Sequence, residues 1–150
     1  MRMSGFEALM EQPSRARVRL DHAHELHARE EHALAVVVAQ TACEVLIRDV
    51  LPTLAQPHLT DNVFPWVLER IRQYTLNDRQ TRDLWSRVAG SAIQDQDFWA
   101  PYKRHLDLRN RIVHRGEAAT ADEAVESLAT AKALVDYVEQ ATGTAPPRTG

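Results

Sequence analysis

The octapeptide RNRIVHRG, residues 109–116, gathers three side chains that can act together on a phosphate group. The guanidinium of Arg109 stays charged and offers a planar fork that fits two phosphate oxygens. The imidazole of His114 exchanges protons near neutral pH, and the amide of Asn110 can hold a hydroxyl group or fix its neighbours. Together they suffice for RNA cleavage without a metal ion, with His114 as the acid or base and Arg109 stabilising the transition state. An ordinary polar helix end explains the same residues, so both interpretations stay open at this point.

Further basic residues surround this octapeptide. The 150-residue chain has a net charge of −3, but five basic residues against one acidic residue give residues 101–116 a charge of +4, which leaves −7 elsewhere. A local basic patch on an acidic chain favours a confined anionic ligand over general coating of nucleic acid. RNA-backbone contacts and a solvated charged face are equally good explanations for the other basic side chains of this window. These side chains are Lys103, Arg104, Arg111 and Arg115.

Helices must position these residues, because the sequence lacks both the period-two alternation of strands and a hairpin turn signal. Apolar periodicity predicts an all-α bundle of five to six helices. No glycine or proline separates the first two helices, so they form either two helices or one long, bent helix. The helices are expected at about 15–29, 31–51, 65–74, 77–90, 97–116 and from 120 onwards.

Capping residues and prolines set the expected ends of these helices. Pro52 and Pro57 should enforce a loop after the second helix, whereas Pro65 suits the first turn of the third. Thr120 and Glu123 form a T-x-x-E capping box at the start of the last helix. The remaining signals are Asn77 and Asp97 as N-caps and Gly90 and Gly116 as C-terminal stops.

The helix expected at 97–116 carries the candidate residues. At about 100° per residue, four apolar side chains share one face, which is expected to point to the core. Arg109 and Asn110 bracket this face. Arg109 and His114 lie about 140° apart on the same wheel, so a substrate reaches both without tight contact between them. The apolar face consists of Trp99, Tyr102, Leu106 and Val113.

The pattern Arg-Asn-x-x-x-His followed by Arg-Gly, at the end of a late helix in a small α-bundle, resembles the HEPN superfamily. The signature of that superfamily is an arginine followed four to six residues later by a histidine, often with a polar residue directly after the arginine. Arg109, Asn110 and His114 match it. The run AVVVAQTACEVLIRDVL also resembles the second helix of the superfamily, with Glu44 as its acidic residue in an apolar stretch. The resemblance covers about residues 15–141, and only the Arg-Asn-His set is specific.

The resemblance implies a metal-independent endoribonuclease of the toxin or phage-defence kind. It also implies a homodimer in which Arg109 of one subunit works with His114 of the other across a cleft. Some members of the superfamily are neutralised by an antitoxin or a partner nucleotidyltransferase. Others are inactive modules that dimerise or bind a partner protein, which is the alternative function for this chain. Glu44 is a candidate for orienting Arg109 or Asn110, and an ordinary i,i+4 pair with Arg48 is equally plausible.

Composition bounds the class of protein. With 44% apolar and 26% charged residues, the chain is typical of one globular domain, expected at 14–142 between a flexible N-terminus, 1–13, and a disordered tail, 143–150. The single cysteine, Cys43, excludes an intramolecular disulfide and a cysteine-based zinc site and fits a reducing cytoplasm.

No stretch has the character of a signal peptide or a membrane span. The histidines near the start lack a metal-binding signature, so neither a metal nor another cofactor is expected.

Overall fold

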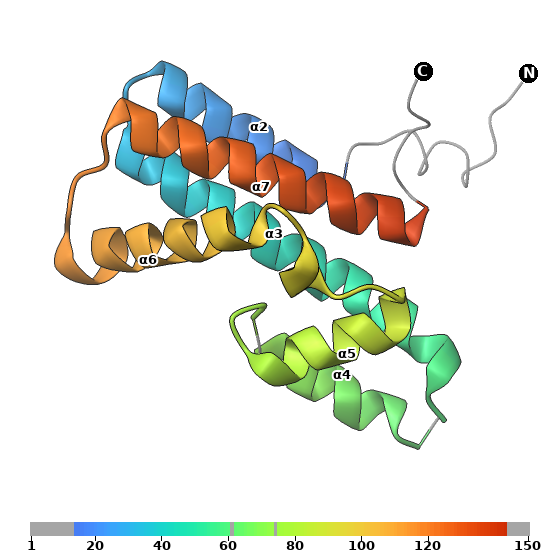
Figure 1. The fold of residues 1–150 in the computed structure, drawn as a ribbon. Coiled ribbons are helices and arrows are strands. Elements are labelled where there is room, and N and C mark those ends of the chain that lie inside the picture. The colour runs from blue at the N-terminus through green and yellow to red at the C-terminus, as the bar shows by residue number, and fades with distance from the viewer. Residues whose placement is uncertain (1–13, 61, 74, 144–150) are drawn as a thin grey trace, which may run out of the picture.

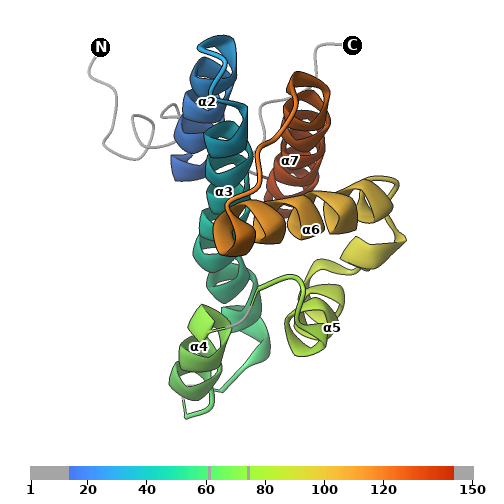
Figure 2. The same cartoon turned by 90° about the vertical axis from the view of Figure 1, so that its left-hand side faces the viewer.

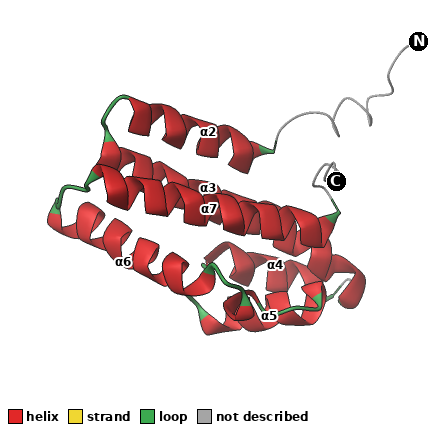
Figure 3. Cartoon of the chain, turned by 45° about the horizontal axis from the view of Figure 1, so that its top comes forward, coloured by secondary structure: helices red, strands yellow, loops and turns green. Residues whose placement is uncertain are grey.

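The computed structural model describes residues 14–60, 62–73 and 75–143. These residues form six α-helices and two short 3-10 helices, with no strand among them (Figure 3). The predicted all-α bundle of five to six helices is therefore confirmed. The predicted flexible segment 1–13 and the predicted tail 143–150 lie outside the described residues, apart from Gly143. In chain order the helices are α2 (Arg15–Ala28), α3 (His32–Ala55), η1 (Gln56–His58), α4 (Phe64–Gln73), α5 (Arg79–Ala89), η2 (Ile93–Asp95), α6 (Trp99–Arg115) and α7 (Ala121–Thr142).

The helix α3 is the centre of the bundle and packs against every other α-helix. The long helices α2, α3 and α7 lie side by side, and α4 and α5 lie near the C-terminal end of α3 (Figure 1). The helix α6 crosses α3 and α7 at an angle and packs against both (Figure 2). Small side chains in the core let the long helices approach closely, and Trp85 and Tyr102 are the largest fully buried side chains among the described residues. The small core residues include Ala23, Ala39, Ala42 and Ala131.

The first two expected helices are separate. The helix α2 ends at Ala28, Glu30 adopts a left-handed backbone conformation (φ 64°), and α3 begins at His32. The rings of His27 and His32 meet across this turn, with their Nδ1 atoms 2.9 Å apart. The sequence left the choice between two helices and one bent helix open, because no glycine or proline marks the break.

The helix α3 continues past Pro52 and ends at Ala55, so the predicted loop at Pro52 is wrong. A proline inside a helix removes one backbone hydrogen bond and crowds the preceding turn. Here the side chains of Leu51 and Ala55 are fully buried, so tertiary packing holds the last turn of α3 in place. Pro57 falls in η1, which follows α3 directly.

Local capping chemistry explains most other helix ends. Gly90 and Gly116 adopt the left-handed conformation as C-caps, and the capping box of Thr120 and Glu123 is present with both of its hydrogen bonds. Two N-cap predictions are one residue off. Asp78, rather than Asn77, caps α5 by accepting from the Thr81 N–H at 3.0 Å, and a carboxylate serves this role as well as an amide. Phe98, rather than Asp97, precedes α6, without a side-chain cap.

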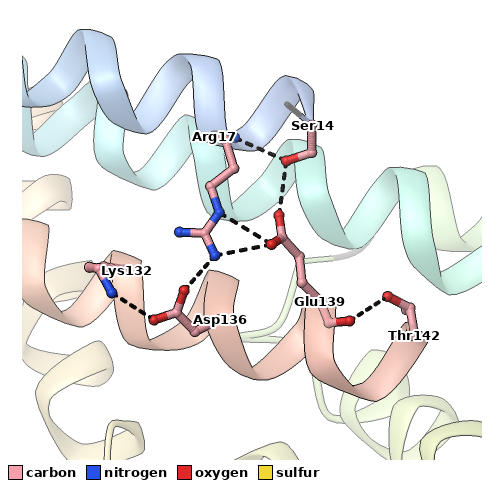
Figure 4. A network of polar contacts seen from close by, with 6 residues as sticks. All are labelled: Ser14, Arg17, Lys132, Asp136, Glu139 and Thr142. Carbon is pink, nitrogen blue, oxygen red and sulfur yellow. Dashed lines mark hydrogen bonds and ion pairs between the residues drawn. The ribbon is translucent and has the colours of Figure 1, made fainter. Parts of the chain in front are cut away.

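A polar network fastens α2 to the C-terminal half of α7 (Figure 4). The buried carboxylate of Glu139 accepts hydrogen bonds from the Ser14 hydroxyl at 3.0 Å and from Arg17 Nη2 at 3.0 Å. Arg17 also pairs with Asp136, which accepts from Lys132 Nζ at 2.8 Å. Burial alone would raise the pKa of Asp136, but the hydrogen bonds from Lys132 and Arg17 hold it below its ordinary value. Ser14 also caps α2, so one network fixes the start of α2 and its partner helix.

Replacing Arg17 with methionine is expected to lower the free energy of unfolding by about 2 kcal/mol, because the buried Glu139 would lose both hydrogen bonds from the guanidinium of Arg17. Arg15→Met is the matched control, since Arg15 pairs with Asp49 on the exposed surface at 3.4 Å, where an ion pair contributes little. Urea denaturation monitored by circular dichroism measures both variants. Equal losses in the two variants would show that the network adds nothing beyond a surface ion pair.

Candidate functional site

The last two turns of α6 carry the predicted catalytic residues. Gly116 ends the helix with φ 66°, and its backbone N–H donates to Ile112 O at 3.0 Å. Asn110 and His114 lie one turn apart with exposed side chains, whereas Arg109 is half-buried. The predicted site is therefore a surface site on a rigid helix, with one of its three members partly inside the protein.

Arg109 and Asn110 are brought together by the structure. Arg109 Nη1 donates to Asn110 Oδ1 at 3.2 Å, while Arg109 Nε is buried and has no hydrogen-bond partner among the described residues. No carboxylate in the described part of the chain forms an ion pair with Arg109. No acidic side chain of the described residues therefore neutralises this guanidinium, which suits it to an anionic ligand.

His114 is not brought into contact with Arg109. Within residues 14–60, 62–73 and 75–143, no hydrogen bond or ring contact joins the two side chains. Their positions on α6 differ by about 140°, and the position of Val113 falls between them. A ligand bound to one chain must therefore span this surface to touch both groups.

Val113 does not face the core, although the helical wheel predicted that it would. Its side chain is 47% exposed. Near its C-terminal end, α6 instead buries Leu108 and packs Ile112 against Val36 of α3 and Ala124 of α7, because it lies over both helices there. Of the other residues on the predicted apolar face, Tyr102 is buried, and Trp99 and Leu106 are half-buried. Val113 is thus an exposed apolar residue within the candidate site.

Behind Arg109 lies a buried polar cluster that sequence analysis missed. His105 Nε2 lies 3.0 Å from Gln40 Oε1, and Gln40 Nε2 donates to the Tyr102 hydroxyl at 3.1 Å. Burial and the positive charge of Arg109 lower the pKa of His105 to about 4, so this imidazole is neutral at pH 7. Burial raises the pKa of Tyr102, which also stays neutral. Two signals were available: His105 precedes Arg109 by one helical turn, and Gln40 is an amide within an apolar run.

Glu44 reaches this cluster from α3. It accepts a hydrogen bond from Gln40 Nε2 at 3.4 Å. Among the described residues it forms no hydrogen bond or ion pair with Arg109, Asn110 or Arg48. Through Gln40, Glu44 is linked to His105, which lies 3.0 Å from Gln40 Oε1.

The surrounding basic residues differ in whether they form ion pairs. Arg104 pairs with Glu126 at 3.1 Å, and Arg111 pairs with Asp107 at 3.2 Å and Glu117 at 3.1 Å. Lys103 and Arg115 are exposed and have no ion pair in the described part of the chain. Arg115 and Lys103 are thus the exposed cations of the predicted basic patch that form no ion pair among the described residues.

A groove of about 470 Å³ runs between α6 and α7. Its charged lining residues are three cationic and three acidic side chains, so their charges balance and the groove does not select anions by charge. The groove is also lined by His105, Leu108 and Ser127. The charged residues are Lys103, Arg104, Arg111, Asp107, Glu123 and Glu126.

Comparisons of the chain with protein-family models, with curated proteins and with solved structures give no match. Among the described residues, no three side chains of the metal-binding types come close enough to hold an ion. None of the described helices combines the length and apolarity needed to span a bilayer.

Proposed function

We propose that this protein is a metal-independent endoribonuclease of the HEPN type that works as a homodimer. His114 transfers the proton that leaves the 2′-hydroxyl of RNA or the proton that the leaving 5′-oxygen takes up. Attack of the 2′-oxygen on phosphorus then breaks the bond to the 5′-oxygen and yields a 2′,3′-cyclic phosphate and a 5′-hydroxyl end. Arg109 stabilises the charge on the phosphorus oxygens, and Asn110 positions Arg109 or the substrate.

The state of Arg109 is the observation that carries this proposal. Its neighbours are neutral: the Asn110 amide bonds to Nη1, and the buried His105 and Tyr102 lie behind it. A guanidinium with no carboxylate partner among the described residues, on the same helix end as an exposed histidine, suits the recognition of a phosphate. Arg115 and Lys103 supply further cations for the RNA backbone. Arg104 and Arg111 add to them, because RNA phosphates readily replace the carboxylates in their exposed ion pairs.

Dimerisation accounts for the separation of Arg109 and His114 in one chain. Val113, between them, is an exposed apolar side chain that a second subunit would cover. A two-fold axis at this face brings Arg109 of one subunit toward His114 of the other. The cytoplasm is the compartment that we propose, because it fits the lone reduced Cys43. An antitoxin or a partner nucleotidyltransferase, as in some members of the superfamily, would bind this same face.

The test is RNA cleavage in the presence of EDTA. The native protein is expected to cut total RNA or tRNA and to leave 2′,3′-cyclic phosphate ends, whereas His114→Ala should reduce the rate by about 10²–10⁴-fold. His24→Ala is the matched control, since His24 is an exposed histidine on α2. Cleavage that survives His114→Ala, or the absence of cleavage by folded, dimeric protein, would contradict the proposal.

The second candidate function is an inactive module that dimerises or binds a partner protein. The exposed Val113 within the site and the buried Nε of Arg109 favour it, because both suit a dry protein interface. A dimer that fails to cleave RNA and dissociates on Val113→Asp would support this function over the nuclease.

A further inference from the structure

We infer that His105 is a positioning residue for Arg109, which it holds through a hydrogen bond from Arg109 Nε–H to His105 Nδ1. The inference rests on the proposed function in so far as it assigns a catalytic use to Arg109. The two atoms are the only buried side-chain nitrogen or oxygen atoms without a hydrogen-bond partner among the described residues. Native proteins leave few such atoms unpaired, and one hydrogen bond between these two atoms would satisfy both.

The hydrogen-bond network determines which nitrogen of His105 carries the proton. Glu44 is a carboxylate and only accepts hydrogen bonds, so the Gln40 amide turns its nitrogen toward Glu44 and Tyr102. Gln40 Oε1 then faces His105 at 3.0 Å and must accept from His105 Nε2–H. A neutral imidazole with its proton on Nε2 has a lone pair on Nδ1, which makes that atom an acceptor.

Arg109 offers the matching donor. Its Nε always carries a hydrogen, and Arg109 follows His105 by four residues on α6, the spacing at which helical side chains meet. The positive charge of Arg109 lowers the pKa of His105, which places the two groups close to each other. A hydrogen bond between the two would pair a buried donor with a buried acceptor, and no third group is needed.

This hydrogen bond would fix the direction of the guanidinium. With Nε held inward by His105 and Nη1 held by Asn110 at 3.2 Å, the remaining donors of Arg109 face outward, where a phosphate binds. The chain of contacts runs from Glu44 through Gln40 and His105 to Arg109, so α3 sets the position of a group on α6. Glu44 thus acts at a distance, by fixing the orientation of the Gln40 amide.

Two isosteric variants separate this role from a structural one. In His105→Asn the amide oxygen takes the place of Nδ1 and keeps an acceptor for Arg109, whereas in His105→Gln the amide nitrogen takes the place of Nε2 and keeps only the contact with Gln40. We expect His105→Asn to retain cleavage within a few fold, and His105→Gln to lose about a hundredfold in kcat with little change in KM. Melting temperatures check that both variants are folded. Equal kcat values in the two folded variants would overturn the inference.

A second measurement does not depend on cleavage. Nuclear magnetic resonance of ¹⁵N-arginine-labelled protein should show a protected Nε–H that Arg109→Met removes, which assigns it to Arg109. This signal is distinct from that of Arg17, whose Nε–H donates to the buried Glu139 at 3.2 Å. Protection is expected to persist in His105→Asn and to vanish in His105→Gln. Protection in both variants, or none in the native protein, would overturn the inference. If the native protein fails to cleave RNA, the proposed function fails, while this measurement still decides whether His105 holds Arg109.

Discussion

Mixing the Arg109→Ala and His114→Ala variants is expected to restore RNA cleavage that neither variant shows alone. Each homodimer of a single variant lacks one of the two groups in both of its sites. A mixed dimer contains one site with neither group and one site with both, because Arg109 comes from one subunit and His114 from the other. Random exchange of subunits should therefore recover about a quarter of the native activity.

The reason for expecting complementation lies in the geometry of α6. Arg109 is half-buried, with its Nε inside the protein, whereas His114 is exposed about 140° away on the same helix. Removing the guanidinium alone should lower the cleavage rate by about 10²–10³-fold, since a single preorganised donor at a developing charge contributes that much. Recovery on mixing then rises well above the background of either variant.

The measurement is the initial cleavage rate of a fluorescent RNA after the two variants are mixed and incubated at a concentration that permits exchange. A mixture of Arg109→Ala with Arg109→Ala/His114→Ala is the control, because no dimer in it has an intact site. If mixing restores nothing while both variants are dimeric, Arg109 and His114 act within one chain, and the composite site is excluded.

The ends of the helices were predictable where the signal is local. Gly116 ends α6 and the Thr120–Glu123 capping box opens α7, since each depends on the backbone within one turn. Pro52 misled the prediction because the burial of Leu51 and Ala55 holds α3 together past a residue that locally opposes it. Tertiary packing can therefore keep a helix intact past a proline near its end, and the local sequence does not contain this information.

The position of the candidate residues at the end of one helix was predictable, but the surroundings of these residues were not. The spacing of Arg109, Asn110 and His114 places them near one helix end, and the structure agrees. The partner of His105 is Gln40, 65 residues earlier, and helical periodicity carries no information about such a pair. Val113 was misplaced for a related reason: a helical wheel assumes a single packing direction, whereas α6 packs against both α3 and α7.

Lowering the pH from 7 to 4 is expected to remove about 3 kcal/mol of stability through His105 alone. The unfolded chain binds a proton at this histidine near its ordinary pKa of 6.5, whereas burial and Arg109 lower the pKa in the folded protein to about 4. Between these values the unfolded state binds more protons, so the free energy of unfolding falls as the pH falls. Well below pH 4 both states are protonated, and the contribution of His105 stops changing.

The surroundings of His105 support the sign of this shift. Its neighbour on α6 is cationic, and its partner on α3 is a neutral amide with a carboxylate beyond it. The acidic side chains of α7 line the groove that His105 also lines. Those acidic side chains pair with Arg104 or cap the backbone, which reduces their pull on the imidazole. The groups in question are Arg109, Gln40, Glu44, Glu123 and Glu126.

Urea denaturation between pH 4 and 8 measures this effect when the native protein is compared with His105→Gln, whose side chain does not titrate. Other histidines and carboxylates titrate in both proteins, so the difference between the two curves isolates His105. The native protein should lose about 3 kcal/mol more than the variant between pH 7 and pH 4. Parallel curves would mean that His105 binds its proton equally well in the folded and unfolded chains, and hence that it is not a buried neutral neighbour of Arg109.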